Sequence, residues 1–139
     1  YRETSAKNTD RILQVLFDMQ TVGLHNQAKN LLNLLLSASI DPRQHREILF
    51  WIADSYQGMN QFDQAALLYL QSAMLPGPTT MDPWAQTARF NAAESLKKAG
   101  LSEDARRIYQ GLLKITQDPA RRALLNRSIQ QLWLKPTVQ

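Results

Sequence analysis

The sequence predicts an all-α fold made of repeated helical hairpins. Apolar residues recur at three- and four-residue spacing through most of the 139 residues, and no stretch alternates as a strand would. Small residues at Ala28, Ala65 and Ala105 each follow a turn signal, and they recur at intervals of 37 and 40 residues. A period in this range is typical of helical repeat arrays, in which stacked hairpins bury a continuous core.

The first expected hairpin covers residues 9–40. Thr9 or Asp10 is expected to cap its first helix, because either side chain accepts a hydrogen bond from a free backbone N–H. Gly23 marks the turn, and the second helix, over residues 26–38, has leucine at five positions. A helix that is apolar nearly all round is either fully buried or covers a partner.

The second expected hairpin covers residues 42–76 and has the clearest pattern. Its first helix carries Leu49, Ile52 and Tyr56 on one face, and its second helix begins near Phe62. Because the polar break between them is short, the two helices are expected to fold back on each other as an antiparallel pair.

Three Asp-Pro pairs mark helix starts. Asp41-Pro42, Asp82-Pro83 and Asp118-Pro119 each join a capping carboxylate to a proline at the first helical position, where the missing N–H costs nothing. The pairs recur at intervals of 41 and 36 residues, which supports the register of the alanines. The third hairpin is therefore expected over residues 83–117, with Ser102 capping its second helix.

Residues 119–134 predict a last helix without a mate. It is expected to cap the apolar face of the third hairpin, as the end of an open repeat array requires. The alternatives are that it begins a further repeat or offers a surface to another chain. Residues 1–139 are expected to form a single domain.

The hairpin pattern resembles the tetratricopeptide repeat (TPR) family, whose unit has about 34 residues. The resemblance covers roughly residues 8–118, and its style is that of bacterial TPR proteins. The second hairpin carries the signature at Leu49, Ile52, Ala53, Tyr56, Asn60, Phe62, Ala65, Tyr69 and Ser72. The third carries it at Ala92, Ala93, Leu96, Gly100, Ala105 and Tyr109, and the first at Ile12, Val15, Met19, Gly23, Ala28 and Leu32. The early tryptophan of the family is missing, its closing proline is displaced, and its first-helix glycine is replaced by Leu16, Ala53 and Ala93.

The resemblance implies a right-handed α-α superhelix of three TPR-like hairpins with a C-terminal capping helix. It also implies a non-enzymatic scaffold that binds a protein or peptide partner in a concave groove lined by the first helix of each hairpin. The groove positions carried over to this chain are Leu13, Phe17, Gln20, Glu47, Phe50, Asp54, Gln57, Phe90, Glu94 and Lys97. The Lys and Asn residues with which some TPR domains hold a peptide carboxylate are absent, so that ligand is not expected.

The large apolar side chains among these positions, Leu13, Phe17, Phe50 and Phe90, allow more than one interpretation. An apolar stripe along a groove is typical of a partner site. Alternatively, the groove is narrow and these side chains pack against neighbouring hairpins. Self-association through them is a further alternative.

Composition gives little support to an enzyme. The chain has no cysteine, and His25 and His45 are 20 residues apart, whereas two metal-binding histidines on one helix are three or four apart. No glycine-rich phosphate loop occurs, so no cofactor, metal or small-molecule substrate is expected. No run reaches the ~20 apolar residues of a membrane span. The compartment stays open between the bacterial cytoplasm and the periplasm.

Charge is uneven along the chain. Residues 1–70 carry a net charge of −1, and residues 71–139 carry +5. The basic side chains of the second half include Lys97, Lys98, Arg106, Arg107, Lys114, Arg121, Arg122 and Arg127. A solvated face is the simplest explanation, and an acidic protein partner comes next. Binding of nucleic acid or an anionic surface is the alternative function. A structural segment of a longer solenoid is the third hypothesis.

Overall fold

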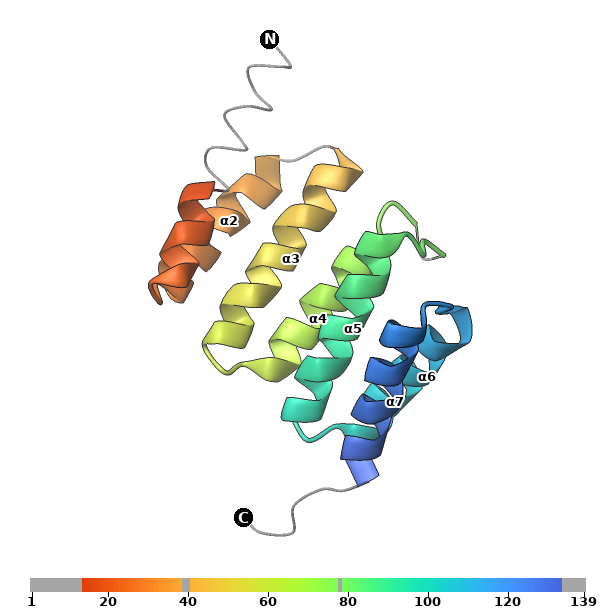
Figure 1. Ribbon diagram of the computed structural model, residues 1–139. Helices are drawn as coiled ribbons and strands as arrows, with labels where there is room; N and C mark the ends of the chain where they lie inside the picture. Colours follow the sequence, from red (N-terminus) through yellow and green to blue (C-terminus); the bar gives the residue numbers. More distant parts are fainter. Residues whose placement is uncertain (1–13, 39–40, 78, 134–139) are drawn as a thin grey trace.

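The computed structural model describes residues 14–38, 41–77 and 79–133 (Figure 1). All regular structure in these ranges is helical, which confirms the predicted all-α class. A helical segment over residues 14–21 comes first. It is followed by α2 (His25–Ala38), α3 (Pro42–Gly58), α4 (Phe62–Ala73), α5 (Pro83–Lys98), α6 (Ser102–Ile115) and α7 (Pro119–Trp133).

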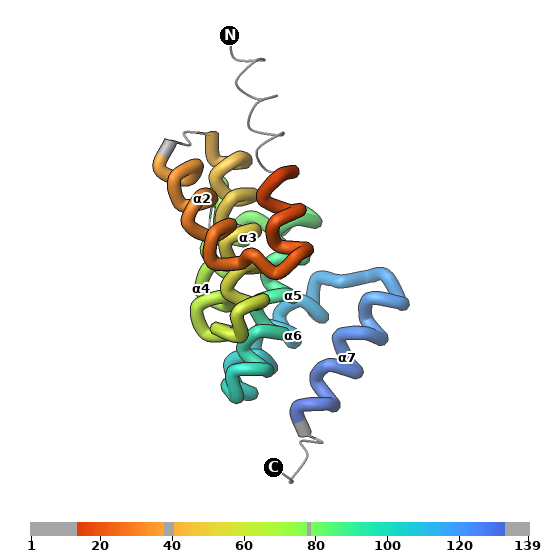
Figure 2. The backbone as a smooth tube through the Cα atoms, turned by 90° about the vertical axis from the view of Figure 1, so that its left-hand side faces the viewer, coloured from red at the N-terminus to blue at the C-terminus, as the bar shows by residue number. Residues whose placement is uncertain are grey.

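From α2 onward, each helix packs against the next one in the chain. Contacts join α2 to α3, α3 to α4, α4 to α5, α5 to α6 and α6 to α7. In Figure 1 the helices follow one another across the molecule, with α5 in front of α4 and α7 in front of α6. Figure 2 shows the same stack from the side, with α7 at the opposite end from α2. Helices α5, α6 and α7 therefore form one end of the described structure.

The three Asp-Pro pairs begin helices, as predicted. Pro42, Pro83 and Pro119 are the first residues of α3, α5 and α7. In each case the preceding aspartate accepts a hydrogen bond from a backbone N–H of the first turn, and this bond satisfies a donor that a helix start leaves unpaired. The donors are Arg43 (3.0 Å), Ala85 (2.9 Å) and Arg121 (3.1 Å).

The turn signals also adopt the expected conformation. Gly23, Asn60 and Gly100 lie in the turns before α2, α4 and α6, and their φ angles are 89°, 61° and 85°. Among ordinary residues, glycine and then asparagine adopt positive φ at the lowest cost. The short breaks in the sequence are therefore helix reversals.

Ser102 does not cap α6, which corrects the sequence-based expectation. It is the first residue of that helix, and Leu101 holds the cap position without a side-chain hydrogen bond. The reason lies in the backbone: the Leu101 carbonyl accepts a bond from the Ala105 N–H at 3.1 Å, so the helix starts one residue early.

The repeated alanines lie in the three main apolar clusters of the described structure. Ala28, Ala65 and Ala105 are each completely buried, as close packing between helices requires. The large residues four positions later are buried in the same clusters: Leu32, Tyr69 and Tyr109.

Helix α2 is buried on one side only. Leu32 is fully buried, whereas Leu31 and Leu34 are 45% and 68% exposed. Of the two interpretations of its leucines, complete burial is therefore wrong. The outer leucines face solvent because no described helix packs on that side of α2.

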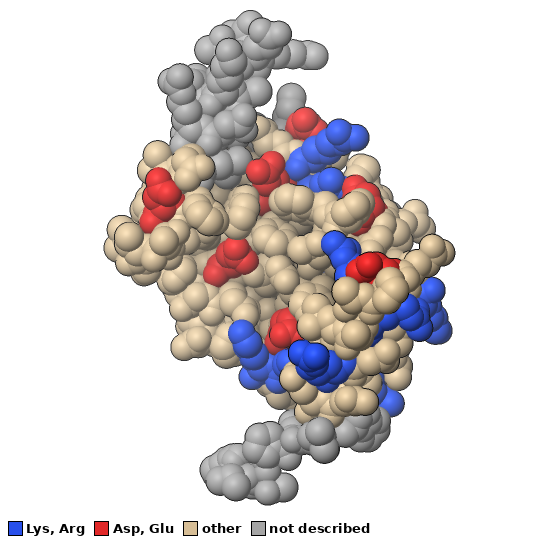
Figure 3. Space-filling model, viewed as in Figure 1, with Lys and Arg blue, Asp and Glu red and all other residues tan. Residues whose placement is uncertain are grey.

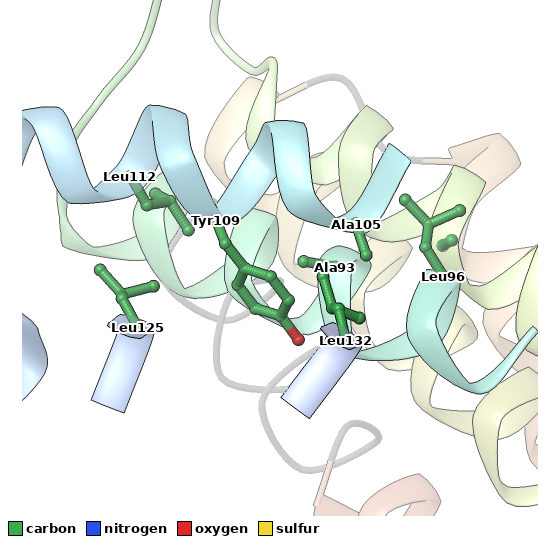
Figure 4. Packing of buried hydrophobic residues seen from close by; sticks show 8 residues of the cluster. Ala93, Leu96, Ala105, Tyr109, Leu112, Leu125 and Leu132 are labelled. Carbon is green, nitrogen blue, oxygen red and sulfur yellow. The ribbon is translucent and has the colours of Figure 1, made fainter. Parts of the chain in front are cut away.

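Helix α7 covers the apolar side of α6. Its Leu125 and Leu132 are buried in the cluster that contains Tyr109 and Leu112 of α6. Figure 4 shows the Tyr109 ring between these two leucines. This packing removes apolar surface of α6 from water.

Candidate functional site

The groove positions expected from the sequence lie on the 14–21 segment, α3 and α5. Phe17 is exposed, and Leu13 lies outside the described residues. The other positions are partly buried: Gln20, Glu47, Phe50, Asp54, Gln57, Phe90, Glu94 and Lys97. Partial burial means that most of these side chains already contact the chain itself.

Three of the polar positions link the first helix of one hairpin to the first helix of the next. In each link, a side chain near the end of one helix (Gln20, Gln57 or Lys97) bonds to a side chain of the next first helix or, in the last case, of α7. The links are Gln20 Nε2 to Ser55 Oγ (2.6 Å), Ser95 Oγ to Gln57 Oε1 (2.6 Å) and Lys97 Nζ to Gln131 Oε1 (3.1 Å). These side chains therefore hold neighbouring hairpins together.

Two acidic groove positions are bonded to buried tyrosines. The Tyr69 hydroxyl donates to Asp54, and the Tyr109 hydroxyl donates to Glu94. Burial raises the pKa of Asp54 above its ordinary value. Burial and the adjacent carboxylate both raise the pKa of each tyrosine. The two acids thus connect the first helix of each hairpin to its second helix.

Phe50 and Trp84 fill the junction between α3 and α5. Their ring centroids are 5.1 Å apart, and Phe50 also meets the edge of Tyr69 at 5.1 Å. Such tilted and edge-to-face pairs are favourable for aromatic rings. Phe50 therefore follows the alternative interpretation of the groove, because it packs against the neighbouring hairpin.

The Trp84 indole is held by polar contacts as well. Its Nε1 donates to Ser72 Oγ at 3.0 Å, and Ser72 Oγ donates to the Arg46 carbonyl at 2.6 Å. The Arg46 guanidinium lies 5.4 Å from the indole centroid and pairs with Asp82 at 2.7 Å. Hydrogen bonds from the Ala85 N–H, which has the larger effect, and from Arg46 hold the pKa of Asp82 below its ordinary value. This junction is therefore filled, and its indole N–H is satisfied.

An open pocket lies at the junction of α5, α6 and α7. Its volume is about 220 Å³. The lining residues are Gln86, Thr87, Phe90, Leu112, Thr116, Arg121, Leu124 and Leu125. Leu112 and Leu125 are buried, whereas Leu124 and Arg121 are exposed and form the rim. Of the groove positions expected from the sequence, only Phe90 lines this pocket.

Helices α3 and α5 correspond at their buried positions, and α7 shares its Asp-Pro start with α5. Buried positions of α3 recur 40 residues later in α5, as the pairs Ile48 and Ala88, Ile52 and Ala92, and Ser55 and Ser95 show. Helices α5 and α7 both start with an Asp-Pro pair, 36 residues apart. Positions around the filled junction can therefore be compared with those around the pocket.

The comparison explains why the pocket is open. Trp84 directly follows Pro83, whereas Ala120 directly follows Pro119. The walls also correspond, since the positions of Phe50, Arg46 and Ser72 are taken by Phe90, Gln86 and Leu112. Ala120 does not itself line the pocket, but it directly precedes the lining residue Arg121, and it has no ring that could reach Phe90 as the Trp84 indole reaches Phe50.

Sequence reasoning missed this pocket because it weighed the large side chains that are present. The signal was the absence of a large side chain at Ala120. An alignment of Asp82-Pro83-Trp84 with Asp118-Pro119-Ala120 shows this difference.

The basic residues of the second half are spread over α5, α6 and α7, and Figure 3 shows basic groups across the lower part and along the right side of the molecule, with acidic groups among them. Several already have partners within the chain. Arg106 pairs with Glu103 at 2.6 Å, and Arg122 Nη1 donates to the carbonyls of Leu113 (2.8 Å) and Thr116 (2.9 Å) at the end of α6. Lys114, Arg107, Arg121 and Arg127 are exposed.

Within residues 14–38, 41–77 and 79–133, no helix is both long and apolar enough to cross a membrane, and no three His, Cys, Asp or Glu side chains form a group that could hold a metal ion.

No protein-family model, curated protein or solved structure matches this chain.

Proposed function

We propose that this chain is a non-enzymatic scaffold for protein–protein interaction. In this proposal, a segment of a partner protein lies across α5 and α7 and inserts an apolar side chain into the pocket beside Phe90. The observation that carries the proposal is the pocket itself, which has apolar walls and an exposed rim at Leu124 and Arg121. Concave sites of this kind are where proteins most often bind ligands.

The proposal includes a right-handed superhelix of three TPR-like hairpins over residues 9–40, 42–76 and 83–117, capped by residues 119–134. Three repeated features support it. The hairpin turns have positive φ, each first helix after the 14–21 segment starts at an Asp-Pro pair, and the same kind of side-chain link joins successive first helices. Such repetition is typical of helical arrays whose groove binds proteins.

The size of the pocket favours a single side chain as its occupant. Pockets for drug-sized ligands and cofactors have volumes of roughly 300–1,000 Å³. An apolar cavity of about 150 Å³ is enough to hold a benzene molecule. At about 220 Å³, this pocket lies between these sizes and suits one side chain of a bound segment.

The first test is site-specific photocrosslinking in cells of the native organism. A benzoylphenylalanine at Leu124, on the pocket rim, should capture a discrete partner, and one at Leu67 should not. Leu67 is a matched control because it is also leucine, is 54% exposed and lies on α4, away from the pocket. Equal crosslinking from both positions would contradict the proposal.

The captured partner then allows a quantitative test with purified proteins. Leu124→Asp should weaken binding about 10- to 200-fold, the range expected when one apolar contact is lost from a well-packed site. Leu67→Asp should leave the affinity unchanged. Calorimetry measures both values, and equal affinities for the two variants would exclude the pocket as the binding site.

The anionic-surface alternative has less support. Arg106 and Arg122 are engaged by Glu103 and by the end of α6, which reduces the basic surface available to a ligand. Binding to nucleic acid would also weaken steeply with salt. A titration with duplex DNA at two salt concentrations separates the two functions.

A further inference from the structure

We infer that the pocket accepts an aromatic ring, phenylalanine in particular, from a partner segment that also carries an acidic residue. This inference rests on the proposed function and specifies the chemistry of the partner. The basis is internal to the molecule: the corresponding junction is filled by an aromatic side chain of the chain itself, Trp84.

The aromatic wall supports a ring as occupant. Phe50 meets the Trp84 ring at 5.1 Å, and Phe90 takes the place of Phe50 at the pocket. Phe90 is itself fixed, because its ring packs against buried Tyr109 at 5.9 Å. A ring entering the pocket would therefore meet an immobile aromatic partner, which favours edge-to-face contact.

The other walls favour a ring without polar atoms. Leu112 takes the place of Ser72, which accepts the Trp84 N–H. The acceptor that holds the indole N–H at the filled junction is therefore missing from this position of the pocket. A phenylalanine ring needs no acceptor and matches these apolar walls.

The rim of the pocket favours an acidic residue in the partner segment. Arg121 is exposed at the edge of the pocket, where the corresponding residue of the filled junction is the buried Ala85. No carboxylate lines the pocket. A partner residue next to the inserted ring would therefore meet a guanidinium, which binds carboxylates through paired hydrogen bonds.

The test is a titration of the ¹⁵N-labelled chain with capped dipeptides, followed by NMR. N-acetyl-Phe-Asp-amide should shift the backbone amides of Gln86, Phe90 and Leu124. N-acetyl-Leu-Asp-amide should bind about 2- to 10-fold more weakly, because it lacks the ring-to-ring contact. The inference is overturned if the leucine peptide binds as tightly, or if the phenylalanine peptide does not shift these amides.

A second arm fills the pocket from within the chain. Ala120→Phe should abolish the shifts caused by the phenylalanine peptide, because its own ring would take the pocket as Trp84 takes the central junction. Ala123→Phe is the control, since Ala123 is exposed on the same helix and the turn of about 100° per residue directs it further than Ala120 from the lining residues Arg121, Leu124 and Leu125. Unchanged peptide binding in a folded Ala120→Phe variant would contradict the inference.

The third arm tests the charge. Arg121→Gln should weaken the Phe-Asp peptide but not N-acetyl-Phe-Ala-amide, and equal loss for both would remove the acidic residue from the inference. If neither peptide binds but Leu124 still crosslinks a specific partner, this inference is overturned and the scaffold proposal is kept. Absence of that crosslinking would overturn the scaffold proposal itself.

Discussion

The junction of α3 with α5 and the junction of α5 with α7 share one architecture and differ in what fills it. At the first, the Trp84 ring lies against Phe50, beneath the Arg46 guanidinium, with its N–H on Ser72. At the second, an alanine follows the proline, and a pocket of about 220 Å³ lies beside Phe90. Two junctions that both include an Asp-Pro helix start therefore differ, since one is filled and the other is open.

The difference indicates how one kind of helix junction can be either filled or open. The helix start, the small buried positions and the links between helices are needed at every junction. A large residue after the proline is not needed at every junction, because its ring fills a volume at the surface end of the junction. Shortening that residue opens a pocket while the surrounding packing is kept, and the following predictions test this view.

The largest effect is expected from opening the central junction. Trp84→Ala should lower the free energy of unfolding by about 3 kcal/mol, the lower end of the range for Phe or Trp truncations, because the indole is only partly buried. Urea denaturation followed by circular dichroism measures this change. Leu67→Ala, at an exposed leucine of α4, should cost no more than about 0.5 kcal/mol. A Trp84→Ala cost as small as that of the control would mean that the ring does not hold the junction.

The next effect compares the two helix starts. Asp118→Ala should cost about 1 kcal/mol through loss of a helix cap. Asp82→Ala should cost up to about 1 kcal/mol more, because Asp82 also pairs with Arg46. Urea titrations of the two variants at pH 7 test this order, and an equal cost would mean that the ion pair adds nothing to the filled junction.

The same pair of variants carries a pH signature. The folded pKa of Asp82 lies below its ordinary value, so its contribution is present above pH ~4, near the unfolded pKa, and is lost as the pH falls through the lower folded value. The excess cost of Asp82→Ala over Asp118→Ala should therefore shrink between pH 7 and pH 3. An excess that grew in acid would reverse the assigned direction.

A smaller effect is expected from closing the open junction. Ala120→Phe should raise the free energy of unfolding by about 1 kcal/mol, as cavity-filling substitutions commonly do. Ala120→Trp should gain less, because Leu112 offers no acceptor for the indole N–H. Thermal unfolding of both variants tests this order, with Ala123→Phe as control. A gain from tryptophan larger than that from phenylalanine would contradict the description of the pocket walls.

The sequence was sufficient for the features that local chemistry determines. Asp-Pro pairs, Gly23, Asn60 and Gly100 act within a few residues, so the helix starts and reversals could be predicted. The burial of the groove side chains could not be predicted, because Phe50 is partly buried through contacts with Tyr69 and Trp84, which follow it by 19 and 34 residues. The pocket was harder still to predict. It depends on a difference between two junctions, whereas the repeat pattern contains only what the junctions have in common.

The smallest effect concerns a feature that both hairpins share, the acid bonded to a buried tyrosine. Burial raises the folded pKa of Asp54, so its ionised form opposes folding above that pKa, and this penalty disappears as the pH falls toward the unfolded value of ~3.9. Asp54→Asn keeps an oxygen that can accept the Tyr69 hydroxyl but carries no charge. The variant should therefore be as stable as the native chain or up to about 1 kcal/mol more stable at pH 7, and this advantage should vanish at pH 3. Urea titrations at the two pH values measure it. A variant that is clearly less stable at pH 7 would show that the charge strengthens the bond to Tyr69 by more than burial costs, and that the pair is held by its ionised form.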